Sequence, residues 1–412
     1  MDQEMAAQVK VLETDSGTPV RWHVLGATFI SYLYDSYDLL VLAITMPVLL
    51  KVLGITLAEG GLLASSTMVG AALGSILIGV VAENRGLKFA IMLSLVGFGI
   101  GTGLIYVIHT WAEWMVLRFL TGIAIGGIWG PSIALLAQHW APKYLARASA
   151  FMLSTFALGA IAAAFVGRLV MATDWRLTFL IGSTSVFVAV YVWFVIPVDK
   201  PRAVKAEAKG PENKIGLRDI LVGDAGKRLA MATLLNVFIM GGYWGAATWI
   251  PTFLVKEREV SLVMMTNFSM FMYVAMFFGY QFFGYLGDRI GRKKAMAVAL
   301  SVCVVSIPVY IIVHNSIFLF WWGTVVGFGY GGPFGLCGAL FAELFADNIR
   351  ALAGGFCWNV GRIGAVLAPF TIGVLGKTYG LSVALVIASC VSLLGLFVLL
   401  FLPKALKDSE PR

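Results

Sequence analysis

The chain has 412 residues, of which 59% are hydrophobic and only 13% are charged, and its formal net charge is +8. A soluble domain carries roughly 25% charged residues, so this composition excludes an ordinary water-soluble globular protein. The mean hydropathy of +0.88 and repeated apolar runs of about 20 residues are typical of a membrane protein with many spanning helices. The excess of Lys and Arg fits cytoplasmic loops that orient such a protein, so we expect a lipid bilayer and no nucleic acid as its partner.

The apolar segments follow one another as two groups of six, separated by one long polar insert. The first group spans residues 23–50, 57–82, 88–109, 111–137, 147–171 and 176–197. The second group spans residues 229–255, 261–286, 293–313, 316–343, 350–376 and 380–402. The pattern predicts an all-α integral membrane protein with twelve transmembrane helices, divided into a cytoplasmic N-terminal segment 1–22, an N-terminal six-helix bundle 23–198, a cytoplasmic linker 199–228, a C-terminal six-helix bundle 229–402 and a cytoplasmic tail 403–412.

Loop charges predict the orientation of the chain. If both termini are cytoplasmic, most of the 30 Lys and Arg lie in cytoplasmic segments, as the positive-inside rule requires. We therefore expect a multi-pass protein of a cell inner membrane with both termini in the cytoplasm. The four cysteines have no CxxC spacing and the histidines form no metal or catalytic set, so we expect no cofactor, no metal and no enzyme activity.

The two groups of spans repeat one another in sequence. GVVAENRGLK (79–88) follows the second span, and GYLGDRIGRKK (284–294) follows the eighth span, 205 positions later. TGIAIGG (121–127) matches VGFGYGG (326–332) at the same offset. These correspondences indicate an internal duplication, and transporters often carry such repeats with the substrate at their interface near the bilayer midplane.

The segment GYLGDRIGRKK resembles the GxxxDRxGRR loop motif of the major facilitator superfamily, and the six-plus-six layout with a charged central loop is similar too. The resemblance covers nearly the whole chain. It implies two pseudo-symmetric six-helix bundles around a central cavity that opens alternately to each side. Members of this family are usually monomeric, so the resemblance also implies a monomer.

The resemblance gives the charged loop residues a gating role, because in that family the loop motif helps to hold the outward-open state. Asp288 is expected to face the positive N-terminal end of a neighbouring helix and to accept hydrogen bonds from Arg. The first-half copy departs from the motif because Glu83 replaces the Asp, so a gate there rests on its basic residues. Glu343 is expected to pair with Arg350 or with loop arginines. The complete predicted gating set is Glu83, Arg85, Lys88, Gly284, Asp288, Arg289, Gly291, Arg292, Glu343 and Arg350.

Three further segments resemble the aromatic acid:proton and sialate:proton symporters. They are DSYD (35–38) in the first span, RFLTGIAIGGIWGP (118–131) in the fourth and NVGRIGAVLAP (359–369) in the eleventh. The fifth span lacks the Gly-Pro pair of drug/proton antiporters, and the PESPR motif of sugar porters has no good match. Ser36 stands where these symporters usually have Gly.

Asp35 and Asp38 place two acids inside a membrane span. A charge there costs at least about 2.5–3.5 kcal/mol, so such residues are functional candidates. Three positions apart, they share a helix face, and two nearby carboxylates in a low-dielectric site disfavour double ionisation. We interpret them as a proton-coupling site and favour Asp38 as the carrier, with Asp35 pairing with a base. The alternative is that one Asp only neutralises a buried Arg.

Two arginines also lie inside predicted spans. Arg118 stays ionised and needs an anionic partner, which is either an Asp of the first span or a substrate carboxylate; a static ion pair is the alternative to a coupling role. Arg362 has no evident acid at its depth in the second half, so it is a candidate clamp for a substrate carboxylate, with Asn359 as an added hydrogen-bond donor. The alternative is that backbone carbonyls satisfy Arg362.

Aromatic residues are expected to supply apolar walls with single polar atoms, which suit an amphipathic organic acid. Others of this type face lipid, and we expect about half of the candidates to line the cavity. The candidates are Tyr34, Tyr37, Trp129, Tyr243, Trp244, Phe334 and Trp358.

The sequence thus predicts a proton-coupled symporter that imports a small organic acid anion, a monocarboxylate and possibly an aromatic one, by alternating access. The first alternative is a proton-independent facilitator or exchanger of organic anions with the same fold. The second is a transporter-like sensor, for which no appended signalling domain is present in the sequence.

Overall fold

The computed structural model describes residues 19–197, 220–346, 348–403 and 406, and these residues are helical almost throughout. Most of the predicted N-terminal segment, linker and tail lie outside the described residues. The helices of the first half are α2 (Pro19–Val52), α3 (Leu57–Arg85), α4 (Leu87–Leu104), α5 (Trp111–Ile125), α6 (Trp129–His139), α7 (Pro142–Val170), α8 (Leu177–Ser183) and α9 (Ser185–Val195). The helices of the second half are α12 (Gly223–Lys256), α13 (Leu262–Ile290), α14 (Arg292–Ile312), α15 (Ser316–Leu344), α16 (Arg350–Tyr379) and α17 (Leu381–Phe401).

Twelve stretches of the described chain are long and apolar enough to cross a membrane. Two of these stretches contain a short break. The fourth stretch consists of α5 and α6, and the sixth consists of α8 and α9. This confirms the prediction of an all-α membrane protein with twelve spans. α12 begins at Gly223, so its first turn includes residues that we expected to belong to the linker.

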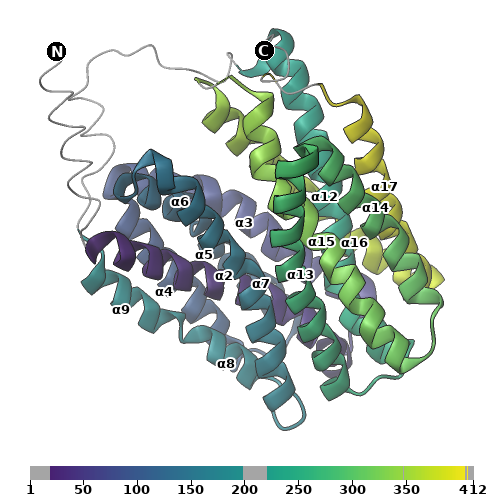
Figure 1. The fold of residues 1–412 in the computed structure, drawn as a ribbon. Coiled ribbons are helices and arrows are strands. Elements are labelled where there is room, and N and C mark those ends of the chain that lie inside the picture. Colours follow the sequence, from purple (N-terminus) through teal and green to yellow (C-terminus); the bar gives the residue numbers. More distant parts are fainter. Residues whose placement is uncertain (1–18, 198–219, 347, 404–405, 407–412) are drawn as a thin grey trace, which may run out of the picture.

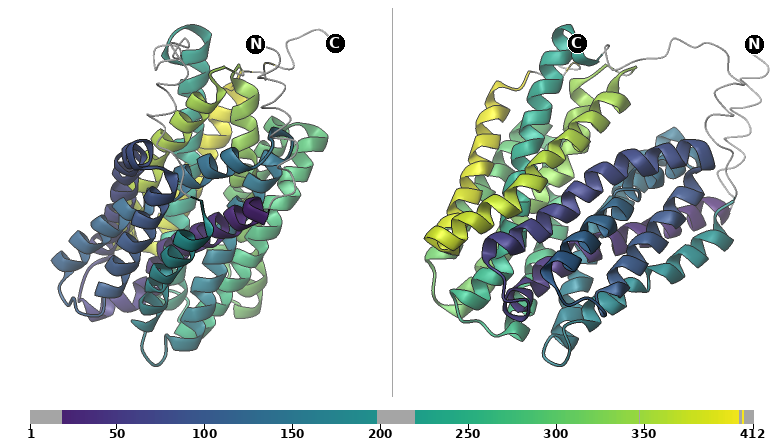
Figure 2. Two further views of the ribbon diagram at one scale, coloured as in Figure 1. Left: turned by 90° about the vertical axis from the view of Figure 1, so that its left-hand side faces the viewer. Right: turned by 180° about the vertical axis from the view of Figure 1, so that it is seen from behind.

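The helices form two bundles, one from α2 to α9 and one from α12 to α17 (Figure 1). The views in Figure 2 show that the axes of the two bundles diverge toward the side on which α2 begins and α17 ends. We call this the terminal side and its opposite the far side.

At the far side the two bundles pack backbone to backbone. A Cβ on Gly61 of α3 would overlap the carbonyl oxygen of Pro369 in α16, and a Cβ on Gly373 would lie about as close to Leu57. A Cβ on Gly60 of α3 would meet side chains instead, with Leu50 of α2 at 2.8 Å and the ring of Trp249 in α12 at 3.4 Å. Glycines therefore form the contact that closes the space between the bundles at the far side. They have no side chain that could rotate away to open it.

Helix ends on the far side carry side-chain caps. Thr56 and Thr110 each form a capping box, with Glu59 at the start of α3 and with Glu113 at the start of α5. Each box satisfies backbone N–H groups that a helix start leaves without partners. Glu113 is thus explained as a helix cap.

The internal repeat is visible in how the helices pack inside each bundle. In the first bundle, a Cβ on Gly74 of α3 would overlap the carbonyl oxygen of Ile123 in α5, and Gly122 lies equally close to α3. In the second bundle, Gly279 of α13 and Gly327 of α15 make the equivalent contacts with the facing helix, 205 positions later. Small residues allow this close approach of membrane helices, so the repeated glycines form the scaffold of both bundles.

We expect Gly74→Ala to lower the thermal unfolding midpoint of the purified protein, because its Cβ has no room against the rigid backbone of α5. Overpacking of this kind costs about 1–3 kcal/mol. Gly79→Ala in the same helix is the matched control, since a Cβ there meets no heavy atom within 4 Å. Equal midpoints for the two variants would contradict the packing account.

Candidate functional site

One ion pair is buried inside the first bundle. Arg118 Nη1 of α5 lies 3.0 Å from Asp38 Oδ2 of α2, and the two side chains are 0% and 1% exposed. The guanidinium also donates to the backbone carbonyl of Asp38 at 3.4 Å. Of the partners considered for Arg118, the structure therefore shows an Asp of the first span.

Two threonines complete the contacts of this pair. Thr102 of α4 donates to Asp38 Oδ1 at 2.6 Å, and Thr67 of α3 accepts from Arg118 Nε at 3.2 Å. Four helices of the first bundle thus meet at one neutral, hydrogen-bonded cluster. Removing one partner of such a pair leaves an uncompensated buried charge, which costs about 3–5 kcal/mol.

A cavity of about 150 Å³ lies between the two bundles. On this measure one water needs about 10–15 Å³, so the cavity has room for a small organic molecule. Its walls are mostly apolar and aromatic, with residues from both halves of the chain. The lining residues are Tyr32, Asp35, Leu39, Met68, Ala71, Ile125, Trp129, Leu153, Phe156, Met240, Trp244, Tyr280, Phe334, Gly338, Trp358, Arg362 and Ala365.

Asp35 and Arg362 bring opposite charges to this cavity from opposite bundles. Asp35 of α2 is 6% exposed, and among the described residues neither Asp35 nor Arg362 forms an ion pair like the one that joins Asp38 to Arg118 at 3.0 Å. Arg362 Nη1 of α16 donates to the carbonyl oxygen of Ala71 in α3 at 3.1 Å, which bridges the bundles. The charges of Asp35 and Arg362 interact across the cavity.

Tryptophan rings cover the cavity on its terminal side. Trp129 of α6 and Trp358 of α16 stack with ring centroids 5.6 Å apart and an interplanar angle of 16°. Trp358 precedes Arg362 by about one turn and therefore lies nearer the terminal side. The indole N–H of Trp129 is buried and has no acceptor among the described residues.

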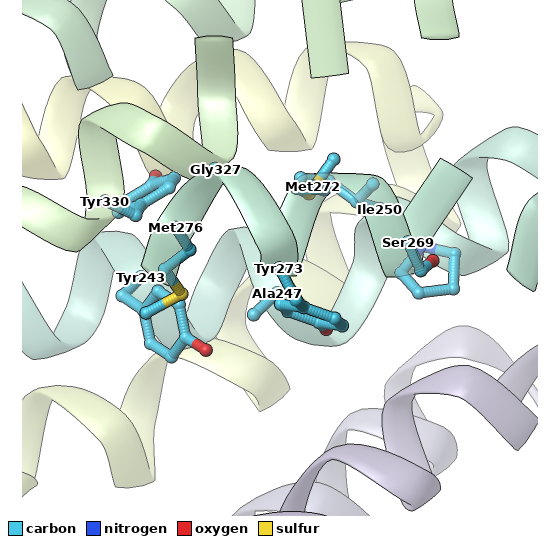
Figure 3. A pocket seen from close by; sticks show the side chains of 10 residues that line it. Tyr243, Ala247, Ile250, Ser269, Met272, Tyr273, Met276, Gly327 and Tyr330 are labelled. Atoms are coloured by element: carbon cyan, nitrogen blue, oxygen red, sulfur yellow. The ribbon is translucent and has the colours of Figure 1, made fainter. Parts of the chain in front are cut away.

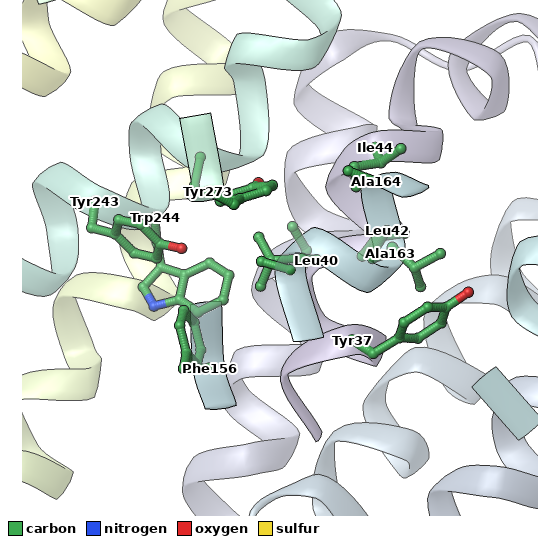
Figure 4. Close-up of a cluster of buried hydrophobic side chains, with 14 of the residues drawn as sticks. Tyr37, Leu40, Leu42, Ile44, Phe156, Ala163, Ala164, Tyr243, Trp244 and Tyr273 are labelled. Carbon is green, nitrogen blue, oxygen red and sulfur yellow. The ribbon is translucent and has the colours of Figure 1, made fainter. Parts of the chain in front are cut away.

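Besides Arg118, four predicted binding residues lie outside this cavity. The hydroxyl of Tyr34 shares a hydrogen bond of 2.7 Å with Thr184, and the hydroxyl of Tyr37 donates to the Thr178 carbonyl at 2.7 Å, so both face the sixth span. Figure 4 shows Tyr37 directed away from Phe156 and Trp244.

The other two are in the second half of the chain. The Asn359 amide donates to the Gly355 carbonyl of its own helix at 2.9 Å, and its side chain is exposed. Tyr243 packs against Phe334 with ring centroids 4.9 Å apart, behind the cavity wall.

Tyr243 instead lines a second cavity, which lies wholly within the second bundle among α12, α13 and α15 (Figure 3). Its volume of about 20 Å³ is enough for one water. The hydroxyl of Tyr243 is buried there and has no partner among the described residues. A third cavity of about 10 Å³ touches Arg118, Thr67 and Trp244, so Arg118 borders a water-sized space and not the central cavity.

Three aromatic residues of the cavity wall were not predicted from the sequence. Tyr32 precedes Asp35 by three positions, and that helical spacing was a signal available in the sequence. Phe156 of α7 packs against Trp244 and Phe334 with ring centroids 6.3 and 6.4 Å apart, and Tyr280 of α13 completes the wall. Nothing in the sequence separates these two from the aromatic residues that face lipid.

The gating residues of the second half form a local network on the terminal side. Arg292 pairs with Asp288, and its Nε lies 3.6 Å from Glu343 Oε1 at the end of α15. Arg350 Nε donates to the Ala342 carbonyl at 2.7 Å. These three contacts lie within the second bundle, so the gating role of this set stays a prediction.

The remaining members of the gating set have simpler surroundings. Gly291 has φ 91° and joins α13 to α14, and a Cβ on Gly284 would meet nothing within 4 Å. Arg289 lies over the Tyr285 ring at 5.2 Å, and Arg85 lies over the Phe89 ring at 5.8 Å. Glu83 is exposed.

Lys88 and its repeat equivalent Lys293 bind helix ends. Lys88 Nζ donates to the carbonyls of Trp193 and Ile196 at 2.6 and 2.5 Å, and Lys293 Nζ donates to those of Leu400 and Leu402 at 3.1 and 2.7 Å. A cation near unpaired C-terminal carbonyls stabilises a helix. Lys88 therefore ties the start of α4 to the end of α9 within its own bundle.

The described residues contain no group of three or more His, Cys, Asp or Glu that could hold a metal ion. The chemical groups that line the central cavity are one guanidinium, one carboxyl group and aromatic faces. This set can bind an anion and exchange a proton.

Comparison with known proteins identifies the family. Residues 24–281 and 265–412 match the family model described as Major Facilitator Superfamily. The sialic acid transporter NanX of Escherichia coli is 25% identical over 380 residues, which cover 90% of this chain and 91% of the relative. The benzoate transport protein of Acinetobacter baylyi is 23% identical over 407 residues, which cover 88% of this chain and 85% of the relative. These relatives confirm the similarity to aromatic acid and sialate transporters that the motifs indicated.

A solved structure shares the fold. It is a bacterial homologue of the human lysosomal transporter Spinster in an inward-facing, unoccupied conformation, with a TM-score of 0.77 and 16% identity over 96% of this chain and 100% of that one. Twelve spans and bacterial relatives together support a multi-pass protein of the inner-membrane type. The family match covers almost the whole described chain, and the protein is a membrane transporter, not an enzyme, that belongs to the Major Facilitator Superfamily.

Proposed function

We propose that this protein is a proton-coupled symporter that imports a small organic acid anion by alternating access. The observation that carries the proposal is the central cavity, which holds the guanidinium of Arg362 and the carboxyl group of Asp35 without a closed ion pair between them. A guanidinium in a low-dielectric site requires an anion, and a carboxylate on a substrate matches its planar donors.

The walls of the cavity favour a planar organic part on that anion. Trp129, Trp244, Phe334 and Trp358 present aromatic faces, and aromatic pairs contribute beyond simple area burial. Relatives named for the transport of benzoate and sialic acid support an organic acid as the substrate class.

The proposed orientation identifies the side of the membrane that the described conformation faces. With both termini in the cytoplasm, the far side is the outside, and the backbone contacts of Gly61 and Gly373 close the cavity there. The described conformation then faces inward, with the stacked tryptophans as its cover. An outside proton and anion would enter when the far side opens and the terminal side closes, which is the alternating access of the fold.

We expect acid-outside proteoliposomes to accumulate labelled benzoate above its external concentration, and a protonophore to abolish this accumulation, because the proton gradient supplies the free energy. Protein-free liposomes correct for diffusion of the neutral acid. Protein-dependent uptake that equilibrates but never accumulates, with or without a pH gradient, would support the proton-independent facilitator instead.

We expect Arg362→Gln to weaken benzoate binding by about 10- to 150-fold, because hydrogen bonds to a charged group contribute about 1.5–3 kcal/mol. Binding is measured by isothermal titration on detergent-purified protein. Arg168→Gln removes the same charge from an exposed position of α7 and should bind as the wild type does. Wild-type affinity in Arg362→Gln would remove the guanidinium from the binding site.

We expect Trp358→Ala to weaken binding of benzoate about 2- to 13-fold more than binding of acetate, because an aromatic contact of about 0.5–1.5 kcal/mol is lost only for the aromatic ligand. Trp321→Ala is the control, since Trp321 is 62% exposed on α15. Equal losses for the two acids would show that the ring supports the cavity without contacting the ligand.

A further inference from the structure

The central cavity contains one positive and one negative group. Its titratable lining residues are Asp35 of α2, Arg362 of α16, Tyr32 of α2 and Tyr280 of α13, and the residues that line it from α3, α5, α6, α7, α12 and α15 are neutral at any pH. Free tyrosines ionise only near pH 10, so neither contributes charge at neutral pH. Asp35 and Arg362 alone decide the net charge of the cavity.

The Asp38–Arg118 pair does not change the net charge of the cavity. Asp38, one turn from Asp35 on the same helix, is bound to Arg118 and to Thr102 inside the first bundle. All three groups are buried, and their cluster is neutral as a unit. Its carboxylate is already used by two donors from its own bundle, whereas the carboxylate of Asp35 is bound to none of the described side chains.

The empty cavity is neutral when Asp35 is ionised, because its charge balances Arg362 across the space between the bundles. A monoanion that binds Arg362 would bring the sum to one negative charge. A proton on Asp35 restores the balance, and net charge in a low-dielectric space is strongly disfavoured. The substrate anion and the carboxylate of Asp35 thus compete for the guanidinium of Arg362. Protonation of Asp35 decides this competition in favour of the anion.

We infer that the Asp35–Arg362 pair makes transport electroneutral, with one proton carried on Asp35 for each monoanion carried on Arg362. This inference rests on the proposed function and adds its stoichiometry, its proton site and its preference for singly charged acids. Asp38, which the spacing alone had favoured as the carrier, is a fixed partner of Arg118 in this scheme. The loaded and the empty cavity are both neutral, so both can change sides without moving charge across the membrane.

The first test needs no variant. In proteoliposomes clamped with potassium and valinomycin, with the uptake of protein-free liposomes subtracted because neutral benzoic acid crosses a bilayer unaided, a pH gradient at zero potential should raise the initial rate of benzoate uptake. The inside-to-outside benzoate ratio at which this protein-dependent flux reverses should be about tenfold per pH unit, as one proton per anion requires. An inside-negative potential without a pH gradient should leave the rate of uptake unchanged. Uptake driven by that potential, or accumulation of about a hundredfold per pH unit, would mean more than one proton and would overturn the inference.

The second test assigns the proton site. Binding of benzoate to the wild type should tighten by up to about tenfold per pH unit from pH 8 to pH 6, because proton and anion binding are reciprocally linked. Asp35→Asn should bind benzoate with less than about a twofold change over this range, and an inside-negative potential should then slow its uptake. Glu259→Gln, an exposed acid-to-amide change at the end of α12, should keep the wild-type dependence on pH. Full pH dependence in Asp35→Asn would overturn the assignment.

The outcomes separate this inference from the proposed function. If neither benzoate nor other small organic acids are accumulated by the protein under any pH gradient, the proposed symport fails. If benzoate is accumulated with protons but the membrane potential also drives it, symport stands and the electroneutral scheme fails. If Asp35→Asn does not fold, the potential and equilibrium measurements on the wild type still decide the stoichiometry.

Discussion

A charge inside the hydrocarbon layer must be balanced, and the interior of this protein is organised around that constraint. The protein balances such charges in two different ways, at two positions of α2 that lie about one helical turn apart. Asp38 and Arg118 form a closed pair with two threonines, which costs the bundle nothing in net charge and holds four helices together. Asp35 and Arg362 balance each other across a cavity, from two bundles, with no direct bond between them. The first pair is closed by direct bonds, and the second pair faces a cavity with no direct bond.

The internal duplication supplies the scaffold but not the chemistry. Glycines at equivalent positions bring α3 onto α5 and α13 onto α15, and lysines at equivalent positions bind the ends of α9 and α17. The charged groups do not follow this symmetry, because the carboxyl groups and Arg118 belong to the first half and Arg362 belongs to the second. Two similar bundles therefore differ in what they bring to the cavity.

The sequence was enough to predict the spans, the repeat and the intramembrane position of the four charged residues. It was not enough to separate the roles of Asp35 and Asp38. A spacing of three residues places them about 60° apart around the helix, which suffices to turn one toward the cavity and the other into the bundle. The difference depends on where α4 and α5 lie, and a pattern along α2 contains no such information. The same limit applies to Tyr34, Tyr37 and Phe156, since amphipathic patterns are weak where lipid and core are both apolar.

The seam at the far side has a consequence for molecules that block transport. Pro369 and Gly61 meet through main-chain atoms, so no rotamer change can admit a ligand there while the bundles keep this relation. An inhibitor confined to the far side of the membrane could not bind this conformation. An inhibitor supplied on the terminal side would instead meet the stacked rings of Trp129 and Trp358, which are side chains and can move apart. Blockers selective for this conformation should thus act from one face only.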